Sequence, residues 1–302
     1  MKFIIAGALA AGLLSFATPA LAQDDAQITP ARENVIYGMV SGAAMLMDVY
    51  APGESNGLGV VVVPGSGWYM PDIYSVPPLK DLSRRDYIRG AVSALMDEGF
   101  TVFVINHRAS PANRFPAAVE DTRRAVRFVR ASAEAFGIDP DHIGIMGHSS
   151  GANLAAMAGY MDDAPGTGVD PIDQQSSAVQ AVVTLAAPFY LYDIENVDVY
   201  GAQTVANYVG VPFYGLDNHY ETTPPVAVLA SPTHYVDAND PPLYMIYSTN
   251  DPVVPPSQAA HMLEALNTAG ATYVEMATDT GEHEPDFDHA AMAVWLEEAL
   301  GG

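Results

Sequence analysis

The sequence predicts a doubly wound, mostly parallel α/β sheet within one domain. Short apolar runs alternate along the chain with segments of helical periodicity, and neither an internal repeat nor a long linker interrupts this alternation. The 302 residues are 49% hydrophobic and 16% charged. This composition excludes a disordered or fibrous chain and is sufficient for a sizeable core.

Two antiparallel strands are expected first, over residues 35–39 and 44–50, and the second alternates between the two faces. Residues 59–63 form a continuous apolar run, which is typical of a strand buried on both faces of a parallel sheet. The remaining strands are expected at residues 101–105, 143–146, 179–185, 243–247 and 272–277.

Helices are expected between these strands, each with apolar side chains along one stripe. Gly270 is a good C-cap for the helix expected at residues 257–268. Four helices are predicted: residues 117–134, one that begins near Ser150, residues 257–268, and a last one with Met292, Trp295, Leu296 and Leu300 at helical spacing.

The stretch from residue 189 to residue 242 has little periodicity of either kind, and it contains seven of the sixteen tyrosines. A long irregular stretch within a compact domain is often functional. We therefore predict a partial cap over the functional site, at about residues 187–241.

Residues 1–22 have the features of a secretory signal peptide. Lys2 gives a short positive start, residues 3–14 are apolar, and residues 20–22 read A-L-A, a small-residue cleavage signal. The apolar run is too short to span a membrane, and no later segment reaches about 18 apolar residues without a charge or a proline. We expect an exported protein without a membrane span, periplasmic or secreted, whose residues 23–302 form a single domain.

The charge of the chain is strongly negative and unevenly distributed. The formal net charge is −24, and all 12 Lys and Arg residues lie before residue 131. Nucleic-acid binding is excluded because phosphate contacts need Lys and Arg. Arg123, Arg127 and Arg130 would share one helix face, with Arg124 beside it, and we expect a solvated face there. The absence of Cys excludes a disulfide scaffold and a Cys nucleophile.

Residues 147–151 read G-H-S-S-G, which matches the G-x-S-x-G pattern of a nucleophile elbow. The context fits, since a predicted buried strand precedes the motif and a small-residue helix follows it. The glycines are needed because the turn is tight and the helix packs close to the strand. Ser149 is therefore predicted to be a nucleophile, exposed at the carboxyl end of the sheet.

A serine hydroxyl needs a base that is held in place by an acid. In a sheet of this kind the chain order should be Ser, Asp, His, with the acid and the base each at the end of a later strand. Asp251 and His283 meet both conditions. Asp240 is the rival acid, but it precedes its strand, and His289 is the rival base, but it falls within the expected final helix.

The negative charge that develops on a substrate oxygen during acyl transfer needs preorganised N–H donors. One is expected to be the backbone N–H of Ser150, the residue after the nucleophile. Others are expected from the loop after residues 59–63, which reads P-G-S-G-W and whose small residues let the backbone approach a substrate. His148 adjoins the nucleophile and is a candidate substrate contact.

With these motifs the chain resembles the α/β-hydrolase superfamily. It is most similar to the esterase/lipase branch with an H-G-G-G-W oxyanion loop, which includes carboxylesterases and carbohydrate esterases. The resemblance implies an α/β-hydrolase fold with a small partial cap and a triad of Ser149, Asp251 and His283. It extends from about residue 47 to residue 300 and includes, besides G-H-S-S-G, the segments 106–108, 115–117, 120–121, 137–141, 230–232 and 250–255.

The oxyanion loop departs from the pattern of this branch at two positions. Pro64 stands where a His is usual, and Ser66 stands where a Gly is usual. The missing His removes a hydrogen bond that braces the loop. By position, the resemblance implies oxyanion donors at Ser66, Gly67 and Ser150, and pocket-lining side chains at Trp68 and Tyr69.

The sequence thus predicts an exported serine hydrolase that cleaves carboxylic esters through an acyl-enzyme. Two alternatives stay open: an arylformamidase-like amide hydrolase or small peptidase with the same triad, and a catalytically inactive binding domain on this fold. The substrate is expected to be a small neutral ester, because 24 acidic residues and no Lys or Arg follow residue 130. No cofactor and no metal ion are expected, since the acidic residues between 282 and 288 lack the spacing of a calcium loop.

Overall fold

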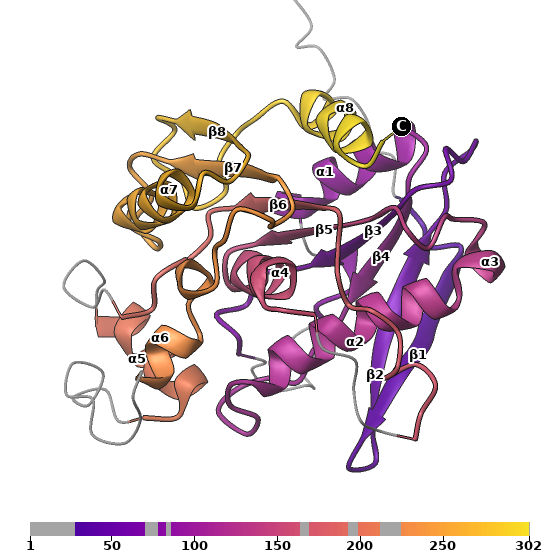
Figure 1. Cartoon of the computed structure of the whole chain (residues 1–302), viewed down its shortest axis with the longest axis horizontal. Helices are drawn as coiled ribbons and strands as arrows, with labels where there is room; N and C mark the ends of the chain where they lie inside the picture. The colour runs from indigo at the N-terminus through magenta and orange to yellow at the C-terminus, as the bar shows by residue number, and fades with distance from the viewer. Residues whose placement is uncertain are drawn as a thin grey trace, which may run out of the picture.

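The computed structural model describes residues 28–69, 78–82, 86–163, 169–192, 199–211 and 225–301. Their centre is an eight-stranded sheet with the strand order β1-β2-β4-β3-β5-β6-β7-β8 (Figure 1). β2 pairs antiparallel with both β1 and β4, and the other neighbouring pairs are parallel. The strands are β1 (Arg32–Val40), β2 (Ala43–Tyr50), β3 (Gly59–Val63), β4 (Thr101–Ile105), β5 (Ile143–His148), β6 (Ala181–Leu185), β7 (Leu243–Ser248) and β8 (Tyr273–Thr278).

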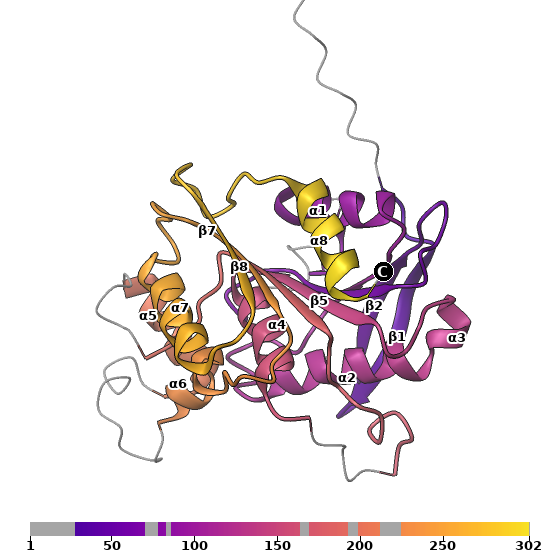
Figure 2. The same cartoon turned by 45° about the horizontal axis from the view of Figure 1, so that its top comes forward.

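Helices cover both faces of the sheet, so the predicted doubly wound architecture is confirmed (Figure 2). α1 and α8 pack against one face, and α2, α4 and α7 pack against the other. The helices are α1 (Asp86–Asp97), α2 (Ala117–Ala131), α3 (Ala133–Phe136), α4 (Ser150–Tyr160), α5 (Val199–Val209), α6 (Val226–Leu229), α7 (Ser257–Ala269) and α8 (His289–Ala299).

β3 shows why a continuous apolar strand suits this fold. All five of its residues are buried. Val61 and Val63 pack into the core beneath α2, α4 and α7, whereas Val60 and Val62 pack into the core beneath α1 and α8. Successive side chains of a strand point to opposite faces, so a strand with helices on both sides is apolar at every position.

Two helices differ from the prediction. The helix expected over residues 117–134 is interrupted at Ser132, whose φ of −107° and ψ of 12° separate α2 from α3. α3 then ends at Gly137, whose φ of 68° lies in the left-handed region that favours glycine. α1 is not among the predicted helices, although buried side chains recur in it at i, i+3, i+4 and i+7: Ile88, Ala91, Val92 and Leu95.

The arginine stripe of α2 is not a solvated face, so this prediction is wrong. The chain that follows α4 runs back along the helix, and the guanidinium groups donate to it. Arg124 donates to the carboxylate of Asp170, for example, and its side chain is only 16% exposed. All four arginines donate to groups in this part of the chain: Arg123, Arg124, Arg127 and Arg130.

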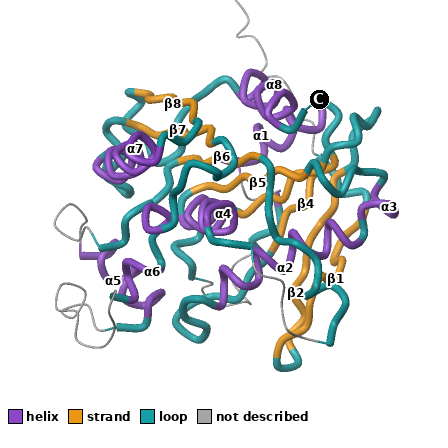
Figure 3. The backbone as a smooth tube through the Cα atoms, viewed as in Figure 1, coloured by secondary structure: helices purple, strands orange, loops and turns teal. Residues whose placement is uncertain are grey.

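Two predicted segments fall wholly or partly outside the described residues. The signal peptide, residues 1–22, lies outside them entirely. Within the described ranges, no helix is both long enough and apolar enough to cross a membrane. The described parts of the predicted cap, residues 187–241, follow β6 and consist of α5, α6, a 3-10 helix at Pro232–His234 and loop segments (Figure 3).

Candidate active site

Ser149 lies in a tight turn between β5 and α4. Its φ of 54° and ψ of −127° are unusual for a residue with a side chain, as in the strained strand-to-helix turn of a nucleophile elbow. A Cβ on Gly147 would lie 2.2 Å from the carbonyl oxygen of Gly151, and a Cβ on Gly151 would lie 2.0 Å from that of Val63. Both glycines of the motif are therefore required by the close approach of backbone to backbone.

The structure brings Ser149, His283 and Asp251 into one chain of hydrogen bonds. Nε2 of His283 lies 2.8 Å from Oγ of Ser149, and its Nδ1 lies 2.9 Å from Oδ2 of Asp251. Asp251 follows β7 and His283 follows β8, and the carboxyl ends of these parallel strands meet at the same edge of the sheet as β5. When Nδ1–H donates to Asp251, Nε2 is free to accept the hydroxyl proton of Ser149.

The other carboxylate oxygen of Asp251 is held by the backbone. Oδ1 accepts hydrogen bonds from the N–H groups of Val253 and Val254, at 2.7 and 2.9 Å. The residue is 8% exposed, so the carboxylate is shielded from water and has one orientation. This arrangement aims Oδ2 at the imidazole.

Neither rival residue reaches this site. Asp240 precedes β7, its carboxylate accepts from the N–H of Asp237, and burial raises its pKa to about 6. His289 is the first residue of α8, where its ring packs on Phe287 and against Gly90 of α1, and burial lowers its pKa.

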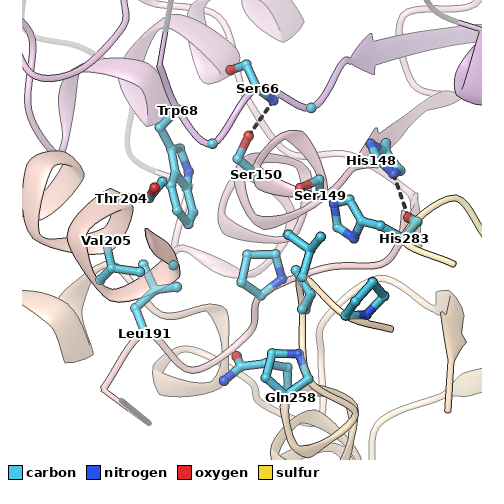
Figure 4. A pocket seen from close by; sticks show the side chains of 18 of the residues that line it. Ser66, Trp68, His148, Ser149, Ser150, Leu191, Thr204, Val205, Gln258 and His283 are labelled. Carbon is cyan, nitrogen blue, oxygen red and sulfur yellow. Dashed lines mark hydrogen bonds between the residues drawn. The ribbon is translucent and has the colours of Figure 1, made fainter. Parts of the chain in front are cut away.

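The predicted oxyanion donors fall into two groups. The N–H of Ser66 donates to Oγ of Ser150 at 2.9 Å, so it already has an acceptor (Figure 4). Gly67 and Ser150 differ, because no acceptor among the described residues is bonded to their N–H groups. Both residues line the same pocket as Ser149. The free donors beside the nucleophile are thus the N–H groups of Gly67 and Ser150.

A pocket of about 500 Å³ opens beside Ser149. One wall is formed by Trp68, Leu191 and Val205, the last of which belongs to α5 (Figure 4). The opposite wall comes from the loop after Asp251 and is also mostly apolar. Such a lining suits the apolar part of a small ligand, and Ser149 and His283 are among its polar members.

The predicted pocket residues Trp68 and Tyr69 differ in position. Trp68 lines the pocket while being 3% exposed, so most of its ring is packed against protein. Tyr69 is 44% exposed and is not among the lining residues, so the prediction that it lines the pocket is wrong. Its backbone forms a parallel bridge with Ser110 instead.

His148 lines the pocket, as predicted, and holds the backbone of His283 in place. It is buried, and its Nε2 lies 3.0 Å from the backbone oxygen of His283, to which the N–H donates (Figure 4). Burial, with the neighbouring charge of His283 as a smaller cause, lowers the pKa of His148 to about 4. The ring packs against Tyr87, with 4.3 Å between centroids. His148 is therefore neutral near pH 7 and holds the loop that carries the base.

Two buried amides near the site were not singled out from the sequence. Asn153, on α4, accepts from the indole N–H of Trp68 at 3.2 Å. Gln258, on α7, accepts from the N–H groups of Phe189 and Tyr190 at 2.9 and 2.8 Å. An amide at an otherwise apolar helix position is the only sequence signal of these contacts. Within the described ranges, no three His, Asp or Glu side chains are grouped so that they could hold a metal ion.

This sheet, with a serine on a strained turn after β5 and a His-Asp pair after later strands, is that of an α/β-hydrolase. The chain belongs to the BD-FAE family, whose model matches residues 47–266. The esterase LipQ of Mycobacterium tuberculosis is 31% identical over 85% of this chain, and the esterase LipC of the same organism is 27% identical over 80%. The chain spans 58% and 57% of the length of these two relatives.

Solved structures of esterases have the same fold. A truncated carbohydrate esterase from gut microbiota superimposes with a TM-score of 0.73 at 25% identity, covering 92% of this chain and 99% of that one. A thermophilic esterase from the Planctomycetes species Thermogutta terrifontis superimposes with a TM-score of 0.67 at 18% identity, over 90% and 91%. The predicted α/β-hydrolase fold and the resemblance to the esterase/lipase branch are thereby confirmed.

Proposed function

We propose that the protein is a serine esterase that hydrolyses carboxylic esters through an acyl-enzyme on Ser149. The observation that carries the proposal is the hydrogen-bonded series from Ser149 through His283 to Asp251, with distances of 2.8 and 2.9 Å. Its similarity to proteins named as esterases supports the same activity. An inactive binding domain would need neither the series nor the strained turn.

The proposed reaction has two halves. Oγ of Ser149 bonds to the carbonyl carbon of the ester while its proton passes to Nε2 of His283. The bond between that carbon and the alcohol oxygen then breaks, and the departing oxygen takes the proton from Nε2. A water molecule then attacks the acyl carbon and gives a proton to Nε2. The bond between that carbon and Oγ of Ser149 breaks, which releases the acid, and Oγ takes the proton back from Nε2. Asp251 keeps the imidazole in the productive tautomer throughout.

The tetrahedral intermediates of both halves carry a negative oxygen. The N–H groups of Gly67 and Ser150 are proposed to donate to it, because they are the free donors beside the nucleophile. Ser150 also begins α4, and the partial positive charge at a helix N-terminus favours an anion there.

The proposed substrate is a small neutral ester with an apolar acyl group. The pocket walls are mostly apolar, and no Lys or Arg occurs among the described residues that line it. The chain after residue 130 carries no Lys or Arg to attract an anionic substrate. Carbohydrates are the first alcohol moieties to test, in the form of acylated carbohydrates, since a structural neighbour is a carbohydrate esterase.

The direct test is hydrolysis of 4-nitrophenyl esters of increasing acyl length, acetylated xylo-oligosaccharides and feruloyl esters. Ser149→Ala is expected to lower kcat by on the order of 10⁶. Ser93→Ala, on α1 and not among the residues that line the pocket, is the matched control and should leave kcat unchanged. A loss below about a hundredfold in Ser149→Ala would refute the nucleophile assignment.

An amide hydrolase of the arylformamidase type is the second candidate. A kynurenine formamidase from Meyerozyma guilliermondii is 22% identical over 84% of this chain and 88% of its own length. An N-formyl aryl amide therefore belongs in the substrate panel. A higher kcat/KM for this amide than for every ester would favour the second candidate.

We also propose that the protein is exported, on the basis of the charge and hydropathy pattern of residues 1–22. Expression of the full chain in a bacterial host, followed by amino-terminal sequencing of the protein outside the cytoplasm, tests this proposal. A mature chain that begins at Gln23 is expected. Retention of an uncleaved chain in the cytoplasm would contradict it.

A further inference from the structure

We infer that Asn153 is a positioning residue for the oxyanion loop, defined as residues 64–68, and that it acts through the indole of Trp68. The inference rests on the proposed function and deepens it, since it states how the Gly67 N–H is kept in place. It concerns a side chain that lines no part of the pocket and touches no substrate in the proposed reaction.

Asn153 has a single possible orientation. It is fully buried on α4, one helical turn after the nucleophile, and its polar atoms all have partners. Nδ2 donates to the backbone oxygens of Pro188 and Ala230, at 3.0 and 3.2 Å. Since two carbonyls need the two N–H bonds, the amide cannot flip, and Oδ1 must face the indole N–H of Trp68 at 3.2 Å.

Trp68 adopts a conformation that requires such support. Its φ of 54° is rare for a bulky residue and costs free energy unless the surroundings hold it. Three contacts do so. The indole donates to Asn153, the ring stacks on Tyr208 of α5 with 4.4 Å between centroids and 5° between planes, and the carbonyl accepts from the N–H of Ser110 at 2.8 Å.

Gly67 lies between two residues of the oxyanion loop that are both hydrogen-bonded to α4. On one side the N–H of Ser66 donates to Oγ of Ser150, and on the other the indole of Trp68 donates to Asn153. The same helix begins directly after Ser149. One rigid element thus sets the position of the nucleophile and of the oxyanion donor together. The hydrogen bond at Trp68 supplies bracing in a loop where Pro64 provides no side-chain donor.

The test removes the indole N–H and keeps an aromatic ring. Trp68→Phe is expected to lower kcat for 4-nitrophenyl acetate by about 10- to 100-fold, because a displaced donor stabilises the transition state less. KM should stay within about twofold, and the rate of inactivation by a neutral phosphonate should fall in parallel with kcat. Trp295→Phe is the matched control, since Trp295 is the other tryptophan of the chain and lies on α8, away from the pocket.

A double-mutant cycle shows whether Asn153 acts through Trp68. Asn153→Ala should lower kcat to a similar extent, and Trp68→Phe combined with Asn153→Ala should lower it no further than Asn153→Ala alone. A residue with only a structural role would change the melting temperature without this non-additive loss in kcat. If Trp68→Phe does not fold, Asn153→Ser gives the measurement, because its hydroxyl is too short to reach the indole.

The outcomes separate this inference from the proposed function. A parent protein without Ser149-dependent esterase activity would refute the proposed function. An active parent whose Trp68→Phe variant keeps kcat and the phosphonate rate within about twofold would overturn the inference alone. Losses in kcat that add in the double variant would also overturn it, because the two side chains would then act separately.

Discussion

The bond between His283 and Asp251 determines which imidazole nitrogen faces Ser149. The Asp251 carboxylate can only accept, so it selects the tautomer with the proton on Nδ1. The N–H groups of Val253 and Val254 in turn fix that carboxylate. A side chain of the same size that can also donate would keep these positions but admit the other tautomer.

Asp251→Asn is therefore expected to fold normally and to lose activity. The amide can donate to Nδ1, which places the imidazole proton on Nε2. A protonated Nε2 cannot accept the hydroxyl proton of Ser149. A fall in kcat on the order of 10⁴ is expected, measured with 4-nitrophenyl acetate at pH 7 beside a melting curve. A variant with unchanged melting and less than a tenfold loss would show that Asp251 does not orient the base.

His148 makes the stability of the fold dependent on pH. Its pKa is lowered to about 4 by burial, whereas an exposed histidine in the unfolded chain titrates near about 6.5. The unfolded chain therefore takes up a proton first as the pH falls. The contribution of His148 is intact above about pH 6.5, and up to about 3 kcal/mol is lost between pH 6.5 and pH 4.

Urea unfolding of the parent and of His148→Gln at pH 7.5 and pH 4.5 measures this effect. The free energy of unfolding should fall less with acidity in the variant than in the parent. Equal falls in the two proteins would mean that His148 is not the group that takes up the proton.

At the scale of elements, the turn between β5 and α4 depends on backbone contacts that exclude side chains. A Cβ on Gly151 would lie 2.0 Å from the carbonyl oxygen of Val63, so α4 packs against the end of β3 backbone to backbone. Gly53 is a contrasting case, because nothing lies within 4 Å of the Cβ position and its backbone needs no left-handed φ.

Gly151→Ala is expected to lower the free energy of unfolding by about 3 kcal/mol or to prevent folding, as overpacking against backbone does. Gly53→Ala should change it by less than about 0.5 kcal/mol. Urea denaturation of both variants provides the comparison. Equal stability of the two variants would contradict the close packing of α4 on β3.

Much of the fold could be predicted from the sequence, because its signals are local. β3 and β4 have the predicted bounds, because a short, continuous apolar run in an α/β chain is typical of a strand buried on both faces. Ser149, Asp251 and His283 could be predicted because each lies shortly after a predicted strand. α1 has a clear apolar stripe and could have been recognised by the same rule as the other helices.

The remaining features depend on contacts between distant segments. The arginines of α2 donate to groups that lie 39 to 54 residues further along the chain, and no local sequence pattern predicts these contacts. The bond between the Ser66 N–H and Oγ of Ser150 joins residues 84 apart, and the Asn153–Trp68 bond joins residues 85 apart. Tyr69, which does not line the pocket, follows Trp68, and the left-handed φ of 54° at Trp68 has no local signal in the sequence.

At the scale of the whole molecule, charge is the dominant feature. The net charge is −24, and the positive charges of α2 are engaged with the chain around them rather than free. The loops that carry Asp251 and His283 belong to the half of the sequence without Lys or Arg. We therefore expect a substrate that approaches the pocket to meet a negative field.

Neutral esters should be hydrolysed with a higher kcat/KM than anionic esters of the same size. Like-charge repulsion slows the approach of an anion. At physiological salt this repulsion is largely screened beyond about 8–10 Å. The measurement compares 4-nitrophenyl hemisuccinate with its neutral isostere 4-nitrophenyl 4-methylpentanoate from low salt to about 1 M. The difference should narrow as salt rises, and a difference that does not respond to salt would place the acidic surface away from the pocket.

The central claim is that Ser149 forms the covalent intermediate. Mass spectrometry of the full chain after reaction with a neutral phosphonate tests it most directly. One adduct per chain on the peptide that contains Ser149, gained at the same rate as esterase activity is lost and absent in Ser149→Ala, is the predicted result. An adduct on another residue, or full activity in the labelled protein, would contradict the account.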